Sequence, residues 1–386
     1  MAKLFVFNPE NDLALACGEP NFTPPVMARR IRRDLQMIQI WLGDEGLVYV
    51  PHDEVGVRFL KSVKTLFLES LKAGIYDGTC GIESISPWGW SPAIASELGR
   101  LFPDAVLEKS AIYKIRELSH RRTSVAIANY LKNNYPAIGE FELPVLCCSL
   151  QEVVASMERF GVCMVKAPWS GSGKGVFRVD KESYRVYENW IRSIISKQGS
   201  VVCEKYLDKV QDFALEFYSD GCSVRYVGPS VFFNNSRFSY EKAMVASSLL
   251  LENHLQKYLK EDCLSLLKSA VSEALGRLVA QSYVGYMGVD MLVYREEGNL
   301  CVMPCVELNL RMTMGLIANR IGERFVEKGR IGEMSVLWHR DAESLTKFVD
   351  SVKKPVIRNG RLESGTLFLA PIYPDSSYTA SVTITQ

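Results

Sequence analysis

One segment, residues 285–315, restricts the possible folds more than any other part of the chain. It reads GYMGVDMLVYREEGNLCVMPCVELNLRMTMG, two apolar strand-like runs joined at Gly298-Asn299. If that pair forms a two-residue turn, Asp290 lies directly opposite Glu307 across the hairpin. Because the residues around these two acids are apolar, the hairpin is expected to belong to a well-covered sheet.

The polar face of this hairpin predicts a metal site. Carboxylates that face each other across a ladder repel and destabilise the sheet, whereas a divalent cation between them reverses the sign of the interaction. Asn309 continues the face of Asp290 and Glu307, so two carboxylates and an amide oxygen come together, and these donors suit Mg²⁺ or Mn²⁺. Arg311 extends the same face and could contact an anion. The alternative is a solvated outer face that holds no ligand.

A second polar feature is the segment 165–179, VKAPWSGSGKGVFRV, which reads as two strands joined by a glycine-rich tip. Lys166 lies on the incoming strand, and backbone N–H groups at glycines can approach an anion closely. The tip is not a P-loop, because Lys174 is followed by Gly175 and no helix follows. We interpret the tip as a lid over phosphates, with a mobile surface turn as the alternative. The lid residues are Gly171, Ser172, Gly173, Lys174 and Gly175.

The first hundred residues alternate strand-like and helix-like segments. Strands are expected at 3–8 and 46–51, and helices are expected at 28–42, 57–74 and 92–102. This alternation is typical of a parallel α/β sheet. The rest of the chain reads as a mixture of helices and antiparallel strands, with helices at 109–131, 183–195 and 261–281 and a hairpin turn at Asp220-Gly221.

Composition and charge exclude several classes of function. The chain has 386 residues, 47% hydrophobic and 23% charged, with a formal net charge of +1, which is unlike a nucleic-acid-binding protein. No apolar run approaches the roughly 20 residues of a membrane span. The 10 cysteines contain no C-x-x-C pair and fit free thiols in a reducing compartment. The N-terminus reads as a strand rather than a signal peptide, so we expect a cytoplasmic protein with no membrane or nucleic-acid partner.

Five stretches of the chain resemble the ATP-grasp superfamily in their order and spacing: LSHRRTSVAIANYL, MVKAPWSGSGKGV, VVCEKYLDKVQDFALEFY, GVDMLV and VELNLRMTMG. They lie within 110–315. The resemblance implies an α/β and α+β chain in which an N-terminal Rossmann-like parallel-sheet domain precedes an ATP-grasp fold of two lobes. The implied domains are an α/β domain at 1–105, a lid lobe with the glycine-rich loop at 106–200, and a metal and catalytic lobe with C-terminal strands at 201–386.

The same resemblance implies a role for each motif. Lys166 and Arg311 would act at the transferring phosphoryl group, and the glycine-rich tip would close over the phosphates of ATP. The magnesium ligands of the family match Asp290, Glu307 and Asn309. The chain departs from the family at His120-Arg121, where many relatives carry Asp-Lys. The other implied cofactor-binding residues are that arginine, the hinge strand that reads adenine and a second acid: Arg121, Glu204, Lys205, Tyr206, Leu207 and Asp212.

The resemblance implies an ATP-dependent ligase with ATP and Mg²⁺ (or Mn²⁺) as cofactors. ATP would phosphorylate a small carboxylate, and an amine or similar nucleophile would displace phosphate from the acyl phosphate. Two alternatives remain open: a phosphotransferase that acts on a small molecule, and a nucleotide-binding module without catalysis. The expected partners are a small-molecule carboxylate and amine, and homodimers are common among relatives.

Two loops are expected to contact the acceptor substrate. Asn11 and Asp12 follow the first strand, where open α/β sheets bind ligands, and turn formation is the alternative role of such residues. Arg237 and Tyr240 lie in the polar segment 231–245, where Arg237 could pair with a substrate carboxylate. The alternative for this segment is an exposed loop without a ligand.

Overall fold

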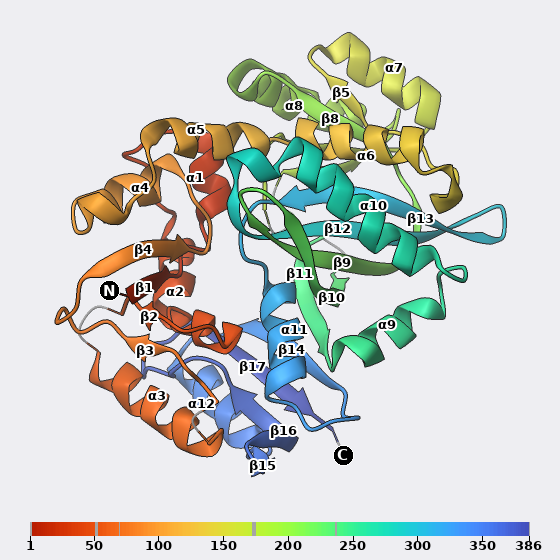
Figure 1. The fold of residues 1–386 in the computed structure, drawn as a ribbon. Helices are drawn as coiled ribbons and strands as arrows, with labels where there is room; N and C mark the ends of the chain where they lie inside the picture. Colours follow the sequence, from red (N-terminus) through yellow and green to blue (C-terminus); the bar gives the residue numbers. More distant parts are fainter. Residues whose placement is uncertain (1, 51–52, 69, 172–174, 236–237, 386) are drawn as a thin grey trace.

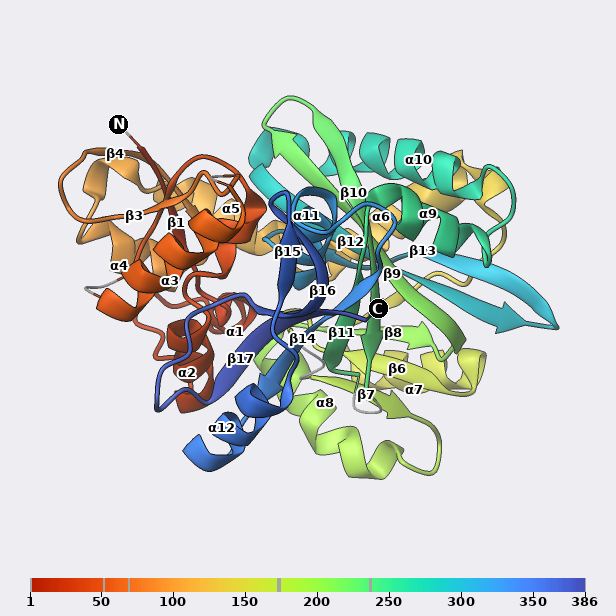
Figure 2. The ribbon, with the colours of Figure 1, turned by 90° about the horizontal axis from the view of Figure 1, so that it is seen from below.

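The structure, a computed structural model, describes residues 2–50, 53–68, 70–171, 175–235 and 238–385. Its strands form a four-stranded parallel sheet, a four-stranded antiparallel sheet and a nine-stranded antiparallel sheet (Figures 1 and 2). No helix among the described residues is both long enough and apolar enough to span a membrane. Some of the predicted site residues lie outside the described residues, namely Ser172, Gly173, Lys174 and Arg237.

The first sheet is parallel, as the alternation of strands and helices predicted. Its order is β3-β2-β1-β4, with β1 (Ala2–Val6), β2 (Leu47–Val48), β3 (Gly74–Ile75) and β4 (Ile82–Pro87). The elements that connect and follow these strands are α1 (Asn11–Cys17), α2 (Val26–Asp34), η1 (Ile38–Leu42), α3 (Glu54–Leu66), α4 (Pro92–Gly99) and η2 (Pro103–Ala105). Because α1 leaves the carboxyl end of β1, its first residues lie where ligands bind in such sheets.

The helix predicted at 28–42 is interrupted. The α-helix ends at Asp34, and a separate, fully buried 3₁₀-helix follows it. The Asp34 carboxylate accepts hydrogen bonds from the backbone N–H groups of Ser377 and Tyr378. The end of α2 is therefore fixed by the last part of the chain, which the local apolar pattern could not indicate.

Two other predicted helices are also wrong in length. The helix expected at 57–74 ends at Leu66, and Gly74 begins a strand because its N–H donates to the carbonyl of Gly46. The helix expected at 109–131 is divided into α5 (Lys109–Leu118) and α6 (Arg122–Asn134). The break directs Arg121 toward the predicted site, where it lines a cavity.

The second sheet carries the glycine-rich tip. Its order is β5-β8-β6-β7, and all three pairings are antiparallel. The short helix η3 (Pro136–Ile138) precedes this part and contacts α6. The strands and helices of the part are β5 (Val145–Cys147), α7 (Leu150–Phe160), β6 (Cys163–Lys166), β7 (Val176–Val179), α8 (Tyr184–Gln198) and β8 (Val201–Lys205). Both helices pack on this sheet through their own small apolar core (Figure 1). The domain boundaries expected after residues 105 and 200 stay predictions.

The nine-stranded sheet has the order β13-β12-β9-β10-β11-β14-β17-β16-β15. Its strands are β9 (Asp208–Asp220), β10 (Val224–Asn234), β11 (Tyr240–Val245), β12 (Val284–Glu296), β13 (Asn299–Asn309), β14 (Gly332–Trp338), β15 (Val356–Arg358), β16 (Arg361–Phe368) and β17 (Tyr378–Ile384). The helices of this part are α9 (Ser248–Gln256), α10 (Cys263–Leu278), η4 (Ala280–Ser282), α11 (Met314–Arg324) and α12 (Ala342–Ser351).

The two faces of β9 have different surroundings. Phe213, Leu215 and Phe217 share one apolar core with residues of α6 and α10, such as Leu267. The residues between them in sequence point to the opposite side and line a cavity. Alternation along the strand thus separates a helix-covered face from a polar face.

The hairpin of β12 and β13 forms, but its turn differs from the prediction. Glu296 pairs with Asn299, so the turn residues are Glu297 and Gly298, both in the left-handed region with φ of 49° and 81°. Positive φ values at both residues are what a type I′ two-residue hairpin turn requires. In both views the tip of this hairpin lies far from the parallel sheet (Figures 1 and 2).

Candidate functional site

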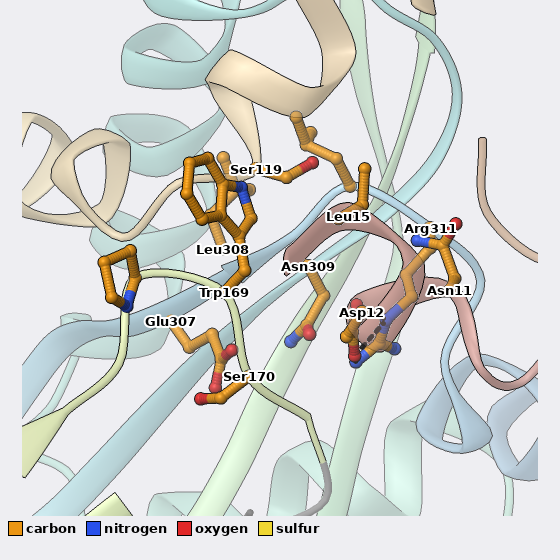
Figure 3. Close-up of a pocket in the computed structure, with 12 residues that line it drawn as sticks. Asn11, Asp12, Leu15, Ser119, Trp169, Ser170, Glu307, Leu308, Asn309 and Arg311 are labelled. Carbon is orange, nitrogen blue, oxygen red and sulfur yellow. Dashed lines mark hydrogen bonds and ion pairs between the residues drawn. The ribbon is translucent and has the colours of Figure 1, made fainter. Parts of the chain in front are cut away.

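A cavity of about 330 Å³ is lined by strands of both antiparallel sheets. It brings together most of the predicted site residues that the structure describes: Arg121, Lys166, Gly171, Glu204, Lys205, Tyr206, Leu207, Asp212, Tyr240, Asp290, Glu307, Asn309 and Arg311. A pocket of about 20 Å³ shares Glu307, Asn309 and Arg311 with this cavity and adds Asn11 from α1 (Figure 3).

The floor of the cavity is the polar face of the nine-stranded sheet. Asp290 on β12 pairs with Glu307 on β13, as the sequence predicted. Gly288 lies two residues before Asp290 on β12, and it pairs with Glu216 on β9 and with Asn309 on β13. Because residues two apart share a face, Asn309 joins the two facing carboxylates on the same side of the sheet.

The facing carboxylates carry unfavourable negative charge. Burial raises the pKa of Asp290 to about 7, and the charge of Glu307 adds to this rise, whereas Arg311 and Asn309 oppose it. A cation between the carboxylates would offset their repulsion. Among the described residues no group of three His, Cys, Asp or Glu side chains could hold a metal ion. A third protein donor at this position would therefore be the amide oxygen of Asn309, which is a suitable Mg²⁺ ligand.

Arg121 is buried at the break between α5 and α6. Its backbone N–H donates to the carbonyl of Pro168, and its Nε donates to the carbonyl of Ala167 at 3.0 Å. Its Nη2 donates to Ser170 Oγ at 3.0 Å and lies 2.9 Å from Oε1 of Glu307. Arg121 therefore fixes the segment before the glycine-rich tip and neutralises one of the two facing carboxylates.

Lys166 and Glu204 form an ion pair above the floor of the cavity. Lys166 is only 6% exposed, and its Nζ donates to Glu204 Oε2 on the neighbouring strand. The next residue, Lys205, forms an ion pair with Glu296 at the turn end of β12. The predicted hinge strand therefore lies at the end of the cavity that is near the β12–β13 turn.

Asp212 and Tyr240 line other parts of the cavity wall. The Asp212 carboxylate accepts hydrogen bonds from Lys209 Nζ at 2.6 Å and from Asn234 Nδ2 at 3.1 Å. Burial raises the pKa of Asp212, and the bond from Lys209 partly offsets this effect. The Tyr240 hydroxyl is buried and has no hydrogen-bond partner among the described residues, and burial raises its pKa.

Arg311 points to the first part of the chain. Asp12 on α1 accepts hydrogen bonds from Arg311 Nε at 3.0 Å and from Nη2 at 2.9 Å (Figure 3). Gly171 packs against the same carboxylate, since a Cβ at that glycine would lie 2.2 Å from Asp12 Oδ2. Asp12 thus contacts both the glycine-rich segment and Arg311. Asn11 lines the small pocket, but its amide donates to the carbonyls of Gly89 and Trp90 in the orientation that suits its neighbours.

The sequence interpretation missed Glu216, which is 1% exposed and lines the cavity. Burial raises its pKa to about 8; a hydrogen bond from Thr313 Oγ1 to Oε1 at 2.7 Å opposes the rise, and the charge of Asp290 adds to it. The signal was present in QDFALEF, because strand alternation puts Glu216 on the face of Asp212. That glutamate reads as an ordinary strand residue until its burial is known.

The chain was compared with known proteins by sequence and by structure. No protein-family model matches it, and neither does any curated protein sequence. The N5-carboxyaminoimidazole synthetase of Staphylococcus aureus, complexed with ADP, gives a TM-score of 0.51 at 13% identity, over 100% of this chain and 93% of that chain. The biotin carboxylase of Campylobacter jejuni, in its β-γ-ATP complex, gives a TM-score of 0.53 at 13% identity, over 100% and 88%.

A third similar structure is the biotin carboxylase domain dimer of the 2-oxoglutarate carboxylase of Hydrogenobacter thermophilus, in complex with MgADP, ADP and bicarbonate. Its TM-score is 0.52 at 15% identity, over 100% of this chain and 86% of that chain. At these identities the likeness concerns the fold, and it extends over the whole chain in each comparison. The expectation from the sequence motifs is confirmed: the chain has the ATP-grasp fold, with a parallel α/β sheet preceding it.

Proposed function

We propose that the protein is an ATP-dependent ligase that activates a small carboxylate as an acyl phosphate and joins it to an amine. The observation that carries the proposal is the facing pair of Asp290 and Glu307 on the floor of a large cavity. Lys166, Glu204 and Arg311 line the same cavity. The solved complexes of similar structures with ADP, β-γ-ATP and MgADP support a nucleotide in such a cavity.

Three side chains would hold Mg²⁺, namely Asp290, Glu307 and Asn309. The donor set fits this ion because it consists of two carboxylates and an amide oxygen on one face of the sheet. Mn²⁺ accepts the same ligands. When bound, the ion would supply positive charge that offsets the charge developing on the phosphates. Arg121 would keep Glu307 in place through the contact of 2.9 Å that it already makes.

The remaining residues would bind and align the substrates. The hinge strand would hold adenine, and Lys166 would direct its ammonium group to the phosphates. The glycine-rich segment 171–175 would cover them and exclude water. Arg311 would stabilise the phosphoryl group as it moves from ATP to the carboxylate oxygen. The amine nitrogen would then bond to the acyl carbon, and inorganic phosphate and a proton would leave.

The proposal is tested by Mg²⁺-dependent ADP release in the presence of pooled small carboxylates and primary amines, with mass spectrometry of the products. We expect ADP, inorganic phosphate and an amide. Glu307→Gln should abolish turnover because it removes one of two facing charges, whereas Glu273→Gln on the exposed side of α10 should not change it. Undiminished turnover by Glu307→Gln would refute the metal assignment. A phosphorylated acceptor would indicate a phosphotransferase, and nucleotide binding without turnover in any pool would indicate a binding module.

A further inference from the structure

One end of the cavity holds a buried carboxylate to which the proposed reaction gives no role. We call this region the Glu216 end; it is lined by Glu216, Ser230, Thr313, Met314 and Gly315. Glu216 pairs with Gly288 on β12, whereas Lys205 of the hinge contacts Glu296 on the same strand. At roughly 3.3 Å per residue, these two positions on β12 lie about 26 Å apart. The Glu216 end is therefore far from the adenine side and close to Asp290.

Glu216 is incompletely paired within the protein. Its Oε1 accepts a hydrogen bond from Thr313 Oγ1, but its Oε2 has no hydrogen-bond partner in the part of the chain that the structure describes. The whole residue is only 1% exposed, although it lines the cavity. A buried carboxylate oxygen without a partner is costly. The arrangement therefore fits a ligand that brings a positively charged donor.

A second polar atom beside Glu216 is also incompletely paired. Ser230 Oγ is buried and has no partner among the described residues. A Cβ at Gly315 would lie 2.2 Å from Ser230 Oγ and 2.8 Å from Glu216 Oε1. Both oxygens therefore lie close to one glycine, and any side chain at that position would collide with them. The missing side chain of Gly315, the second residue of α11, is what allows these two oxygens to lie at this end of the cavity.

We propose that the Glu216 end binds the amino group of the acceptor substrate. In this site Glu216 pairs with the ammonium group, and Ser230 Oγ accepts one of its hydrogen bonds. Met314 lines the Glu216 end, and Phe232, two residues from Ser230 on β10, also lines the cavity, so the acceptor is a primary amine with an apolar carbon chain. This inference rests on the proposed ligase function, to which it adds the substrate class and the residues that recognise it.

The test is calorimetric titration of the full-length protein with 2-phenylethylamine and hexylamine, alongside the uncharged probes 2-phenylethanol and 1-hexanol. Both amines should bind the wild type. Glu216→Gln should lower the affinity for each amine about 30-fold or more, as expected when a buried charge partner is lost. The two alcohols should bind both proteins equally. Ser230→Ala should lower the affinity for the amines about 5-fold. The matched change Glu273→Gln, at an exposed site, should leave this affinity unchanged.

Equal amine affinities of the wild type and Glu216→Gln would overturn the proposal, as would a wild type that binds no amine. Circular dichroism shows whether Glu216→Gln folds. If it does not fold, the proposal is overturned when Ser230→Ala binds the amines with the same affinity as the wild type. Titration with Mg²⁺ and the ATP analogue AMP-PNP is run in parallel. A loss of Mg²⁺ affinity in Glu216→Gln without a loss of amine affinity would assign Glu216 to the metal and also overturn the proposal. A wild type that binds amines but no nucleotide would refute the ligase function and not the amine site.

Discussion

Replacing Glu216 with glutamine should make the stability of the metal-free protein less dependent on pH. Burial raises the pKa of Glu216 to about 8 in the folded chain, against about 4.3 for an unperturbed glutamate. Between these values the unfolded chain has lost the proton and the folded chain has kept it. The unfolded state thus binds fewer protons, so the free energy of unfolding falls as the pH rises. This contribution is fully present below about pH 4.3 and is lost by about pH 8.

The size of the effect follows from the two pKa values. Their difference corresponds to about 5 kcal/mol of folding free energy, of which about 4 kcal/mol falls between pH 5 and pH 8.5. Relaxation and water penetration around a buried charge reduce such penalties, so we expect a loss of about 2–4 kcal/mol in the wild type. Glu216→Gln should escape this loss. Its amide group costs about 1–3 kcal/mol where Oε2 lacks a partner, but that cost is the same at every pH.

The measurement is urea unfolding in EDTA at pH 5.0, 6.5 and 8.5, followed by circular dichroism and tryptophan fluorescence. The quantity of interest is how the difference between wild type and Glu216→Gln changes with pH. Glu273→Gln is the control: hydrogen bonds from Tyr130 and Tyr135 lower the pKa of Glu273, so this group is ionised in the folded and unfolded states over most of the window. Its difference from wild type should stay flat. Parallel curves for wild type and Glu216→Gln would refute the burial argument.

Two further substitutions test the contacts of the arginines. Arg121→Met leaves Glu307 without its partner at 2.9 Å and should lower the free energy of unfolding, measured in urea, by about 3–5 kcal/mol. A change below about 1 kcal/mol would mean that solvent already stabilises the Glu307 charge. Asp12→Asn weakens the two-point contact with Arg311 and should cost about 1–3 kcal/mol, with Asp104→Asn as an exposed control.

The register of the central hairpin could be predicted because it depends on parity. Moving a two-residue turn by one position moves every cross-strand partner by two residues, so each side chain stays on its face. The turn lies one residue earlier than expected, yet Asp290 still pairs with Glu307 because a bulge between Asp290 and Leu292 shifts the register back. That Asp290 and Glu307 share a face could therefore be predicted from the sequence. Their direct pairing depends on a bulge that no residue pattern indicates.

The contacts of Arg121 and Glu216 could not be predicted from local sequence. The apolar periodicity of 109–131 is that of one helix, and the break at Arg121 is stabilised by the carbonyl of Pro168 from a distant segment. The burial of Glu216 depends on two glycines on other elements, Gly288 and Gly315, whose missing side chains make room for its carboxylate. Such features arise from tertiary packing, which overrides local pattern.

The charges around the cavity indicate two different ligands, one for each of two buried carboxylates. Arg121 is paired with Glu307, and Arg311 is paired with an aspartate of α1. Asp290 and Glu216 then have no ion-pair partner among the described residues, and burial raises the pKa of each. Asp290 faces a second acid, Glu307, across the ladder, and this pair of carboxylates favours a divalent ion. Glu216 faces Ser230, Thr313 and apolar walls, so a single carboxylate charge is present there, which suits a single ammonium group better than a divalent ion.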